Sequence, residues 1–388
     1  MYPLGPAALI LMPMLVGGLI DGRGIGEQQA GYIASAEGMG VVVASWVAVL
    51  WVRRVSWTRV LVAGCAVTAV LNLVSAVMAS YHGLLVMRFL AGFSGGTIFA
   101  LTVAALGDNR HPDRAFGIAQ VVQGALMFLA FAASPAILEH WSVAGLYVLL
   151  AVAALVMLLA VWRFPSQGAR RIAAASSGAA ASNHAALIWL GLIASFLFFA
   201  CVFGFWAYLE RIGRSAGLSL ESIGFALGAS QFAAIIGAGA AALASTRFGR
   251  ALPLLLVMGG QLLVLWMLVG RFSSLEFFIG AGLFQALFVL ANSYQLGVIS
   301  KIDVKGSSLV LVTGFQGLGA GVGPGIAALL IEGESYVRIN QAAALACVVG
   351  IVMFLFIIQR TRHLASPLAG ADDTPSRSSG PVSGSLRG

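Results

Sequence analysis

Two ionisable side chains, Arg88 and Glu37, lie inside long apolar stretches of the sequence. An arginine at the centre of a bilayer-spanning helix costs about 2.5 to 3.5 kcal/mol on insertion scales, so such a residue is a candidate functional group. Arg88 lies six residues from one end of its apolar run, and Glu37 lies seven residues from the corresponding end of another. At about 1.5 Å per residue both charges are about 9 to 10 Å deep, so we expect them to pair directly or to face a common aqueous cavity.

The pair has two interpretations, and the sequence favours neither. In the functional one, Arg88 binds the anionic group of a substrate while Glu37 takes up and releases a proton during a transport cycle. In the structural one, the two residues form a permanent ion pair that holds two helices together.

Five uncharged polar residues within apolar runs form a second candidate group. Side chains of this type usually bridge neighbouring helices, with each contact worth about 0.6 kcal/mol. Taken together, the glutamines among them predict a pocket that offers hydrogen bonds without charge to a semi-polar solute. The five residues are Gln123, Gln231, Gln285, Asn292 and Gln316.

The sequence offers no clear motif for nucleotide binding, metal binding or catalysis. The glycine-rich stretches at 92–96 and 317–325 follow no strand and lack the Lys-Ser/Thr ending of a phosphate loop, so ATP-driven transport is not expected. The five histidines lie in or beside loops without shared spacing, and the three cysteines lie inside apolar runs. Asp108, His111 and Asp113 share one short loop, where salt bridges are the ordinary explanation. We therefore expect no enzyme activity, metal or cofactor, with a proton gradient as the driving force.

The elements that must hold these residues are membrane helices. The chain has 388 residues, of which 60% are hydrophobic and 9% charged, and its mean hydropathy is +0.96. Soluble domains are about 25% charged. Since about 20 apolar residues cross a bilayer, the apolar runs predict an all-α membrane protein with twelve transmembrane helices. The predicted spans are 2–20, 30–51, 59–80, 83–107, 115–138, 144–162, 186–208, 222–245, 251–270, 273–296, 307–331 and 339–359.

The spans divide into two six-helix bundles, at 1–162 and 186–359. Residues 163–185 between them are rich in Arg, Ser and Ala, which is typical of a flexible linker. The polar tail at 360–388 is expected to be disordered. The first run lacks the basic start of a signal peptide, so we expect it to stay in the mature protein. It is short for a leading span, and the sequence leaves open whether Met1 is the true start.

The positions of the basic residues predict the orientation. Of the 22 Lys and Arg residues, sixteen fall on one side of this threading, five fall on the other, and Arg88 belongs to neither. Because cytoplasmic loops hold the excess of Lys and Arg, both termini and the linker are expected in the cytoplasm, with the helices in a bacterial inner membrane. The net charge of +8 thus reflects membrane topology, and no nucleic-acid partner is expected.

The two halves also resemble each other. Residues 31–38 (GYIASAEG) align with 224–231 (GFALGASQ), and residues 134–137 (SPAI) align with 323–326 (GPGI). Both matches share an offset of about 190 residues, which indicates an internal duplication of the kind found in many transporters.

With six spans, a linker and six more spans, the chain resembles the major facilitator superfamily over nearly its whole length. That family carries a Gly, acidic and Arg-rich turn after its second span, with a weaker copy after its eighth. Here the second copy is present at 245–250 (STRFGR), whereas the first, at 51–59 (WVRRVSWTR), lacks its Gly and acidic residue. Residues 88–96 (RFLAGFSGG) resemble the Arg-x-x-x-Gly motif of proton-coupled members. The glycine-proline motif of drug-proton antiporters is mostly missing from 117–135.

The resemblance implies two pseudo-symmetric bundles that rock around a site near the membrane midplane, with the first, fourth, seventh and tenth helices around the cavity. We therefore expect a monomeric secondary transporter in the lipid bilayer that imports a small organic anion together with protons. Proton-linked efflux of drug-like compounds or metabolites is the alternative within this class. A sensor or scaffold with a transporter fold that transports nothing is the alternative outside it.

Overall fold

The computed structural model describes residues 2–52, 54–164, 185–244, 251–302, 308–333 and 335–361, and these residues are almost entirely helical. Most of the predicted linker and tail, and the 245–250 motif, lie outside the described residues. An isolated bridge between Glu332 and Ser335 is the one β pairing found in the described part. The helices are η1 (Tyr2–Leu4), α1 (Ala7–Ile10), α2 (Met12–Arg23), α3 (Glu27–Trp51), α4 (Trp57–Val77), α5 (Tyr81–Gly107), α6 (Pro112–Ala160), η2 (Val161–Arg163), α7 (Ala185–Ala207), α8 (Leu209–Ser215), α9 (Leu220–Ala244), α10 (Ala251–Met267), α11 (Ser274–Ile302), α12 (Ser308–Leu329) and α13 (Val337–Arg360).

These helices confirm the twelve predicted spans. Within the described residues, eight helices are long and apolar enough to cross a membrane. The first span is divided among η1, α1 and α2, and α10 and α12 supply two further spans. The fifth and sixth spans together form α6, which is interrupted at Ser142, where φ is 53° and ψ is −164°. Met127 and Leu150 line one groove from opposite sides of this interruption, so the chain turns back on itself there.

The packing of the helices repeats between the halves. In the first half α3 packs against α5 and α4 against α6, and in the second half α9 packs against α11 and α10 against α13. These are equivalent pairs in the order of the spans, as the predicted duplication requires. The halves contact each other through α3 with α12 and through α6 with α9.

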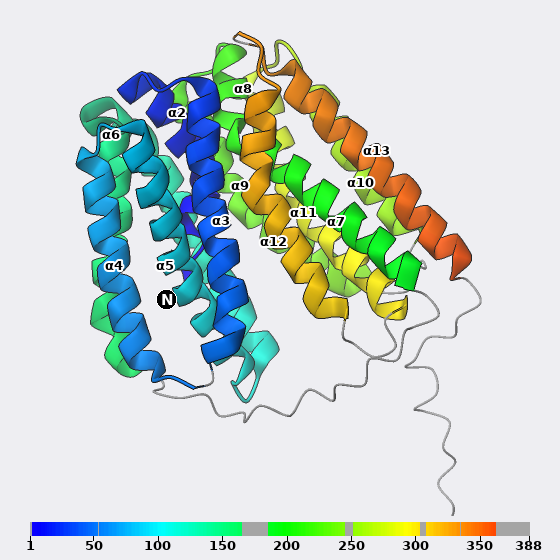
Figure 1. Ribbon diagram of the computed structural model, residues 1–388. Helices are drawn as coiled ribbons and strands as arrows, with labels where there is room; N and C mark the ends of the chain where they lie inside the picture. Colours follow the sequence, from blue (N-terminus) through cyan, green and yellow to red (C-terminus); the bar gives the residue numbers. More distant parts are fainter. Residues whose placement is uncertain are drawn as a thin grey trace, which may run out of the picture.

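The halves approach each other closely near the middle of α3. A Cβ on Gly38 of α3 would lie 2.8 Å from the Cα of Gly321 on α12, so only glycine allows the two backbones to come this near. Beside this contact the Gly325 amide of α12 donates a hydrogen bond of 2.6 Å to Ser35 Oγ. From there α3 and α12 diverge toward the bottom of Figure 1.

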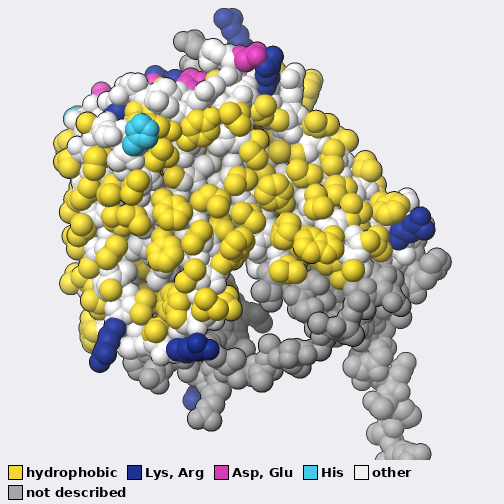
Figure 2. All heavy atoms as spheres, viewed as in Figure 1, with side chains coloured by type: hydrophobic (Ala, Val, Ile, Leu, Met, Phe, Trp, Pro, Cys, Tyr) yellow, Lys and Arg dark blue, Asp and Glu magenta, His cyan; other side chains and the backbone are white. Residues whose placement is uncertain are grey.

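We call the end where the halves meet, formed by the last turn of α2, the first turn of α3 and α8, the closed face. The opposite end, where η2 stops at Arg163 and α7 starts at Ala185, is the linker face. Between the two faces the surface is covered by hydrophobic side chains, and nearly all charged side chains in view lie at the ends (Figure 2). An apolar belt between polar ends is what a bilayer requires of an integral membrane protein.

Candidate functional site

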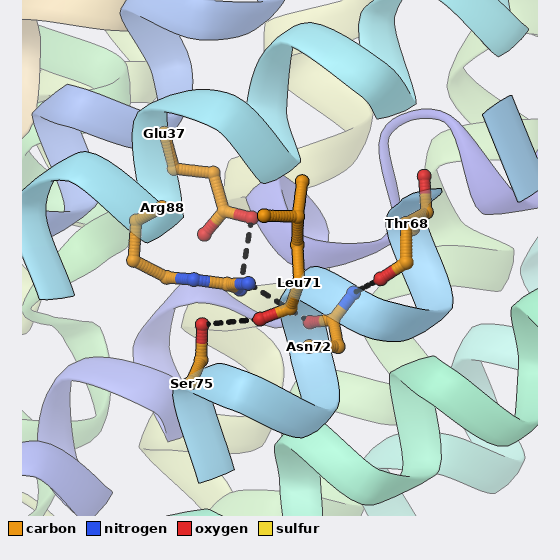
Figure 3. A network of polar contacts seen from close by, with 6 residues as sticks. All are labelled: Glu37, Thr68, Leu71, Asn72, Ser75 and Arg88. Carbon is orange, nitrogen blue, oxygen red and sulfur yellow. Dashed lines mark hydrogen bonds and ion pairs between the residues drawn. The ribbon is translucent and has the colours of Figure 1, made fainter. Parts of the chain in front are cut away.

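Arg88 of α5 lies inside the first half, with 1% of its surface exposed. Its Nη1 donates to Glu37 Oε1 of α3 at 3.2 Å, and its Nη2 donates to Asn72 Oδ1 of α4 at 3.1 Å. The guanidinium also lies over the ring of Tyr147 in α6, 4.6 Å from the ring centre. Figure 3 shows the arginine side chain extended between Glu37 and Asn72. The two charges that were predicted to lie at the same depth therefore pair directly.

Small residues bring the helices of this pair together. A Cβ on Gly92 of α5 would lie 2.0 Å from the carbonyl oxygen of Glu37, and a Cβ on Gly40 of α3 would lie 2.1 Å from that of Phe89. Each helix thus offers a glycine where the other presents backbone. Membrane helices commonly use small residues in this way to pack closely. This packing keeps Glu37 within reach of Arg88.

Further hydrogen bonds hold the side-chain amide of Asn72 on α4, which is the second partner of Arg88. Asn72 Nδ2 donates to the carbonyl of Thr68 at 2.8 Å, which leaves its Oδ1 directed at Arg88 (Figure 3). Thr68 Oγ1 in turn donates to Ser94 Oγ on α5 at 2.8 Å, and Ser94 Oγ donates to the carbonyl of Gly64 at 2.9 Å. The network therefore joins α4 and α5 and holds the Asn72 side chain in one orientation.

The pair is electrically neutral as a unit, but Arg88 is not fully satisfied. Its Nε has no hydrogen-bond partner among the described residues. A cavity of about 20 Å³ beside the pair is lined by Glu37, Thr68 and Asn72. About 10 to 15 Å³ holds one water molecule, so the cavity admits a water but no organic solute. In this conformation the pair is closed to organic ligands.

The uncharged candidates do not gather around Arg88. Gln316 Nε2 of α12 donates to Asn292 Oδ1 of α11 at 2.9 Å, so these two residues meet within the second half. Gln231 of α9 is buried and donates to the carbonyl of Leu227 at 3.4 Å. Gln123 Oε1 of α6 is buried without a hydrogen-bond partner among the described residues. Gln285 is half-buried on α11.

Two members of this set lie near the boundary between the halves. A Cβ on Gly124, the neighbour of Gln123, would lie 3.7 Å from the carbonyl oxygen of Gln231. These residues therefore belong to the facing helices α6 and α9. The predicted pocket lined by all four glutamines stays a prediction.

A second polar network, which the sequence analysis did not predict, joins the halves at the closed face. Arg211 of α8 donates to Asp21 Oδ1 of α2 at 2.8 Å and to Tyr336 Oη at 3.4 Å. The Tyr336 hydroxyl also donates to the carboxylate of Glu27 in α3, and Tyr208 Oη donates to the Glu27 carbonyl at 2.8 Å. Burial is the first cause that raises the pKa of Tyr336, and the Glu27 carboxylate adds to it. The phenol is therefore protonated and acts as the donor to Glu27.

Asn72 and Tyr147 were also missed as partners of Arg88. Thr68, Asn72 and Ser75 recur at helical spacing in the apolar run at 59–80, and this spacing was the available signal for a polar stripe. Tyr147 carried no comparable signal, because an aromatic residue in a membrane span is ordinary.

Solved structures of transporters share this fold. A bacterial homologue of the human lysosomal transporter Spinster has 13% sequence identity and a TM-score of 0.66, over 94% of this chain and 95% of that chain. A D-xylose-proton symporter has 13% identity and a TM-score of 0.71, over 90% and 95%. The nucleoside transporter NupG has 10% identity and a TM-score of 0.69, over 93% and 99%. At these identities the likeness concerns the fold.

Comparison with curated protein sequences gave no match. The sequence profile described as Major Facilitator Superfamily matches residues 7–278, which is more than half of the chain. With twelve spans, two equivalent halves and this match, the protein is a membrane transporter rather than an enzyme, and the chain belongs to the Major Facilitator Superfamily.

Proposed function

We propose that this protein is a proton-coupled secondary transporter that imports a small organic anion by alternating access. The observation that carries the proposal is the buried ion pair between Arg88 and Glu37, which has one acidic member, one basic member and a water-sized cavity beside it.

Protonation of Glu37 would change the balance of charge around Arg88. The guanidinium would keep the Asn72 carbonyl oxygen and the Tyr147 ring, and neither carries a charge. An uncompensated buried charge is strongly destabilising, by about 3 to 5 kcal/mol when one partner of a buried pair is removed. This cost is relieved if an anion replaces the carboxylate or if the helices rearrange. The uptake of a proton by Glu37 and the binding of an anion at Arg88 are therefore thermodynamically linked.

The way in which the halves meet supports alternating access. The contacts between them concentrate on α3 with α12 and on α6 with α9, and these two pairs are equivalent under the internal repeat. The closed face is held by side-chain hydrogen bonds such as those of Arg211 and Tyr336, which can break and reform as the halves rock. With the linker in the cytoplasm, the closed face would be the outer one.

Transport by purified protein in liposomes tests the proposal. Wild-type protein should accumulate an organic anion from a carboxylate panel when the outer pH is lower than the inner pH, and a proton ionophore should abolish accumulation. Glu37→Gln should lose accumulation driven by the gradient but retain exchange of anion for anion, because its side chain is permanently neutral. Arg88→Lys, which keeps the charge without the planar fork, should weaken anion binding.

Glu276→Gln is the matched control, since Glu276 lies on the closed-face side at the start of α11 and is exposed. Normal transport by both Glu37→Gln and Arg88→Ala would refute the assignment of the site. Transport of sugars or nucleosides with no transport of anions would refute the substrate class. A lack of flux for every solute in wild-type protein would favour the sensor or scaffold alternative.

A further inference from the structure

A cavity of about 360 Å³ opens at the closed face, at the boundary between the halves. We call it the closed-face pocket. The first half contributes Gly17 to Gly22 of α2 and the region of α6 around Ser142, and the second half contributes Glu210, Leu220 and Glu221. It is separate from the Arg88 pair, which lies deeper in the first half.

Among the described residues, the charged side chains that line the pocket are all acidic, with no Lys, Arg or His. Asp21 is neutralised by Arg211, to which it is hydrogen-bonded at 2.8 Å. No ion pair is formed by Glu139, Glu210 or Glu221 within the described part of the chain. Glu139 and Glu221 are exposed and lie on opposite halves, so each half supplies one carboxylate to the rim. Figure 2 shows acidic side chains gathered at this end of the molecule.

Glu210 is the acidic residue that is buried in this pocket, with only 1% of its surface exposed. Its Oε2 has no hydrogen-bond partner among the described residues. A Cβ on Gly17 would lie 2.1 Å from this oxygen, so a glycine in α2 makes the room for a carboxyl group from α8. A buried carboxylate is costly unless a proton or a cation compensates it.

A second residue with an unpartnered polar atom lines the pocket from the other half. Ser142 Oγ is buried and has no hydrogen-bond partner in the described residues. It lies over Gly22, where a Cβ would come within 2.0 Å of the hydroxyl. Ser142 is also the one non-glycine residue with positive φ in the described chain, at 53°. A strained residue at a site is a reason to look for a role there.

We propose that the closed-face pocket binds a small organic cation that carries an ammonium group. The ammonium donates to the Glu210 carboxylate, and the rest of the molecule extends toward Glu139 and Glu221 at the rim. An ammonium carries a positive charge and three N–H donors, so it suits a buried carboxylate that has an unpartnered oxygen. Charge-assisted hydrogen bonds of this kind are among the strong ones.

The arrangement suits an organic cation better than a metal ion. Within the described residues no group of three or more His, Cys, Asp or Glu side chains is placed to hold a metal. The pocket volume of about 360 Å³ also falls in the range of small-molecule sites, which is about 300 to 1,000 Å³.

Titration of Glu210 adds a pH signature to the site. Burial raises the pKa of the Glu210 carboxyl to about 7, Arg211 and Arg214 on α8 lower it, and Asp21 on α2 raises it. Glu139 of α6 and Glu221 of α9 are the other charged residues that line the pocket. A proton and an ammonium would compete for the same oxygen, so affinity for the cation should rise with pH through about 7.

The bound cation would hold the halves together, because Glu139 comes from the first half and Glu210 and Glu221 come from the second. It should therefore stabilise the conformation that is closed at this face and slow transport when it is added from this side. The binding itself does not depend on the proposed function, and only the effect on flux rests on it.

Calorimetric titration of the full-length protein in detergent with 1,4-diaminobutane tests the site. The matched probe 1,4-butanediol, which has hydroxyls in place of the ammonium groups, should not bind. Glu210→Gln, which is nearly isosteric, should weaken diamine binding about tenfold or more. The exposed control Glu276→Gln should leave it unchanged.

Equal binding of diamine and diol, or unchanged diamine affinity in Glu210→Gln, would overturn the proposal. A pH-dependent stability change that is abolished in Glu210→Gln while diamine does not bind would identify Glu210 as a proton site only, and would also overturn it. If Glu210→Gln fails to fold, the exposed double variant Glu139→Gln with Glu221→Gln provides the test, and unchanged affinity there would count against the site. Diamine binding without any solute flux would support this site and refute the proposed transport function.

Discussion

A change of pH should open the closed face of the ligand-free protein through Glu210. The carboxyl group is buried at the boundary between α8 and α2 when the halves are closed, and it would be hydrated when they separate. Its pKa should therefore fall from about 7 in the closed form to its ordinary value of 4.5 in the open form. The closed form binds the proton more tightly, so protonation favours closure.

The sign and size of the effect follow from this difference. The raised pKa stabilises the closed form fully below about pH 4.5, and this contribution is lost as the pH rises to about 7. A shift from 4.5 to about 7 is about 2.5 pH units, or about 3 kcal/mol at 1.36 kcal/mol per unit. The ratio of closed to open protein should therefore fall by up to about 300-fold between pH 4.5 and pH 7. Arg211, Arg214 and Asp21 set this value together with burial.

Spin labels across the closed face would measure the change. Gln28 at the start of α3 is exposed, and so is Val337 at the start of α13, next to the contact between Glu27 and Tyr336. Distances between labels on Gln28→Cys and Val337→Cys, with the three native cysteines replaced by alanine, should lengthen as the pH rises. A distance distribution that stays constant with pH would refute the reasoning. An equal pH-dependent change of the label distance in Glu210→Gln, which has no titrating group at this position, would also refute it.

Two further predictions concern the packing and the closed face. Gly92→Ala should destabilise the first half by about 1 to 3 kcal/mol, because the new methyl group meets the Glu37 carbonyl oxygen. Gly107→Ala is the control, since it has open space around it and should be nearly neutral. Thermal unfolding of the two purified variants checks both expectations. Arg211→Ala removes the hydrogen bond to Asp21, whose side chain is half exposed, and should weaken closure by about 0.5 to 1 kcal/mol. Longer distances between the same spin labels at constant pH would confirm this prediction, and unchanged distances would contradict it.

The sequence was sufficient to predict the helices and the central ion pair. Apolar runs must become helices in a bilayer, and the gap predicted between the spans 115–138 and 144–162 contains the interruption of α6 at Ser142. Arg88 and Glu37 could be paired because each stands alone in its run at the same depth, which leaves few other partners for either charge.

The remainder of the site depends on information that hydropathy does not contain. Asn72 contacts Arg88 only because α4 is rotated to present it, and Tyr147 reaches the same guanidinium from α6. The rotation of a membrane helix about its axis is set by side-chain packing, and an apolar run looks the same at any rotation. The contact between Glu27 and Tyr336 joins residues 309 positions apart, at helix ends that each carry ordinary polar residues.

The contact between Gly38 and Gly321 has a mechanical consequence. Since two bare backbones touch there, the contact itself holds no side chain that would have to move when α3 tilts against α12. From Gly38 to the end of α3 at Trp51 is about 20 Å at about 1.5 Å per residue. A swing of about 20° about this fulcrum would carry the far tip of the helix through about 7 Å, so a small hinge movement at two glycines becomes a gap wide enough for a solute.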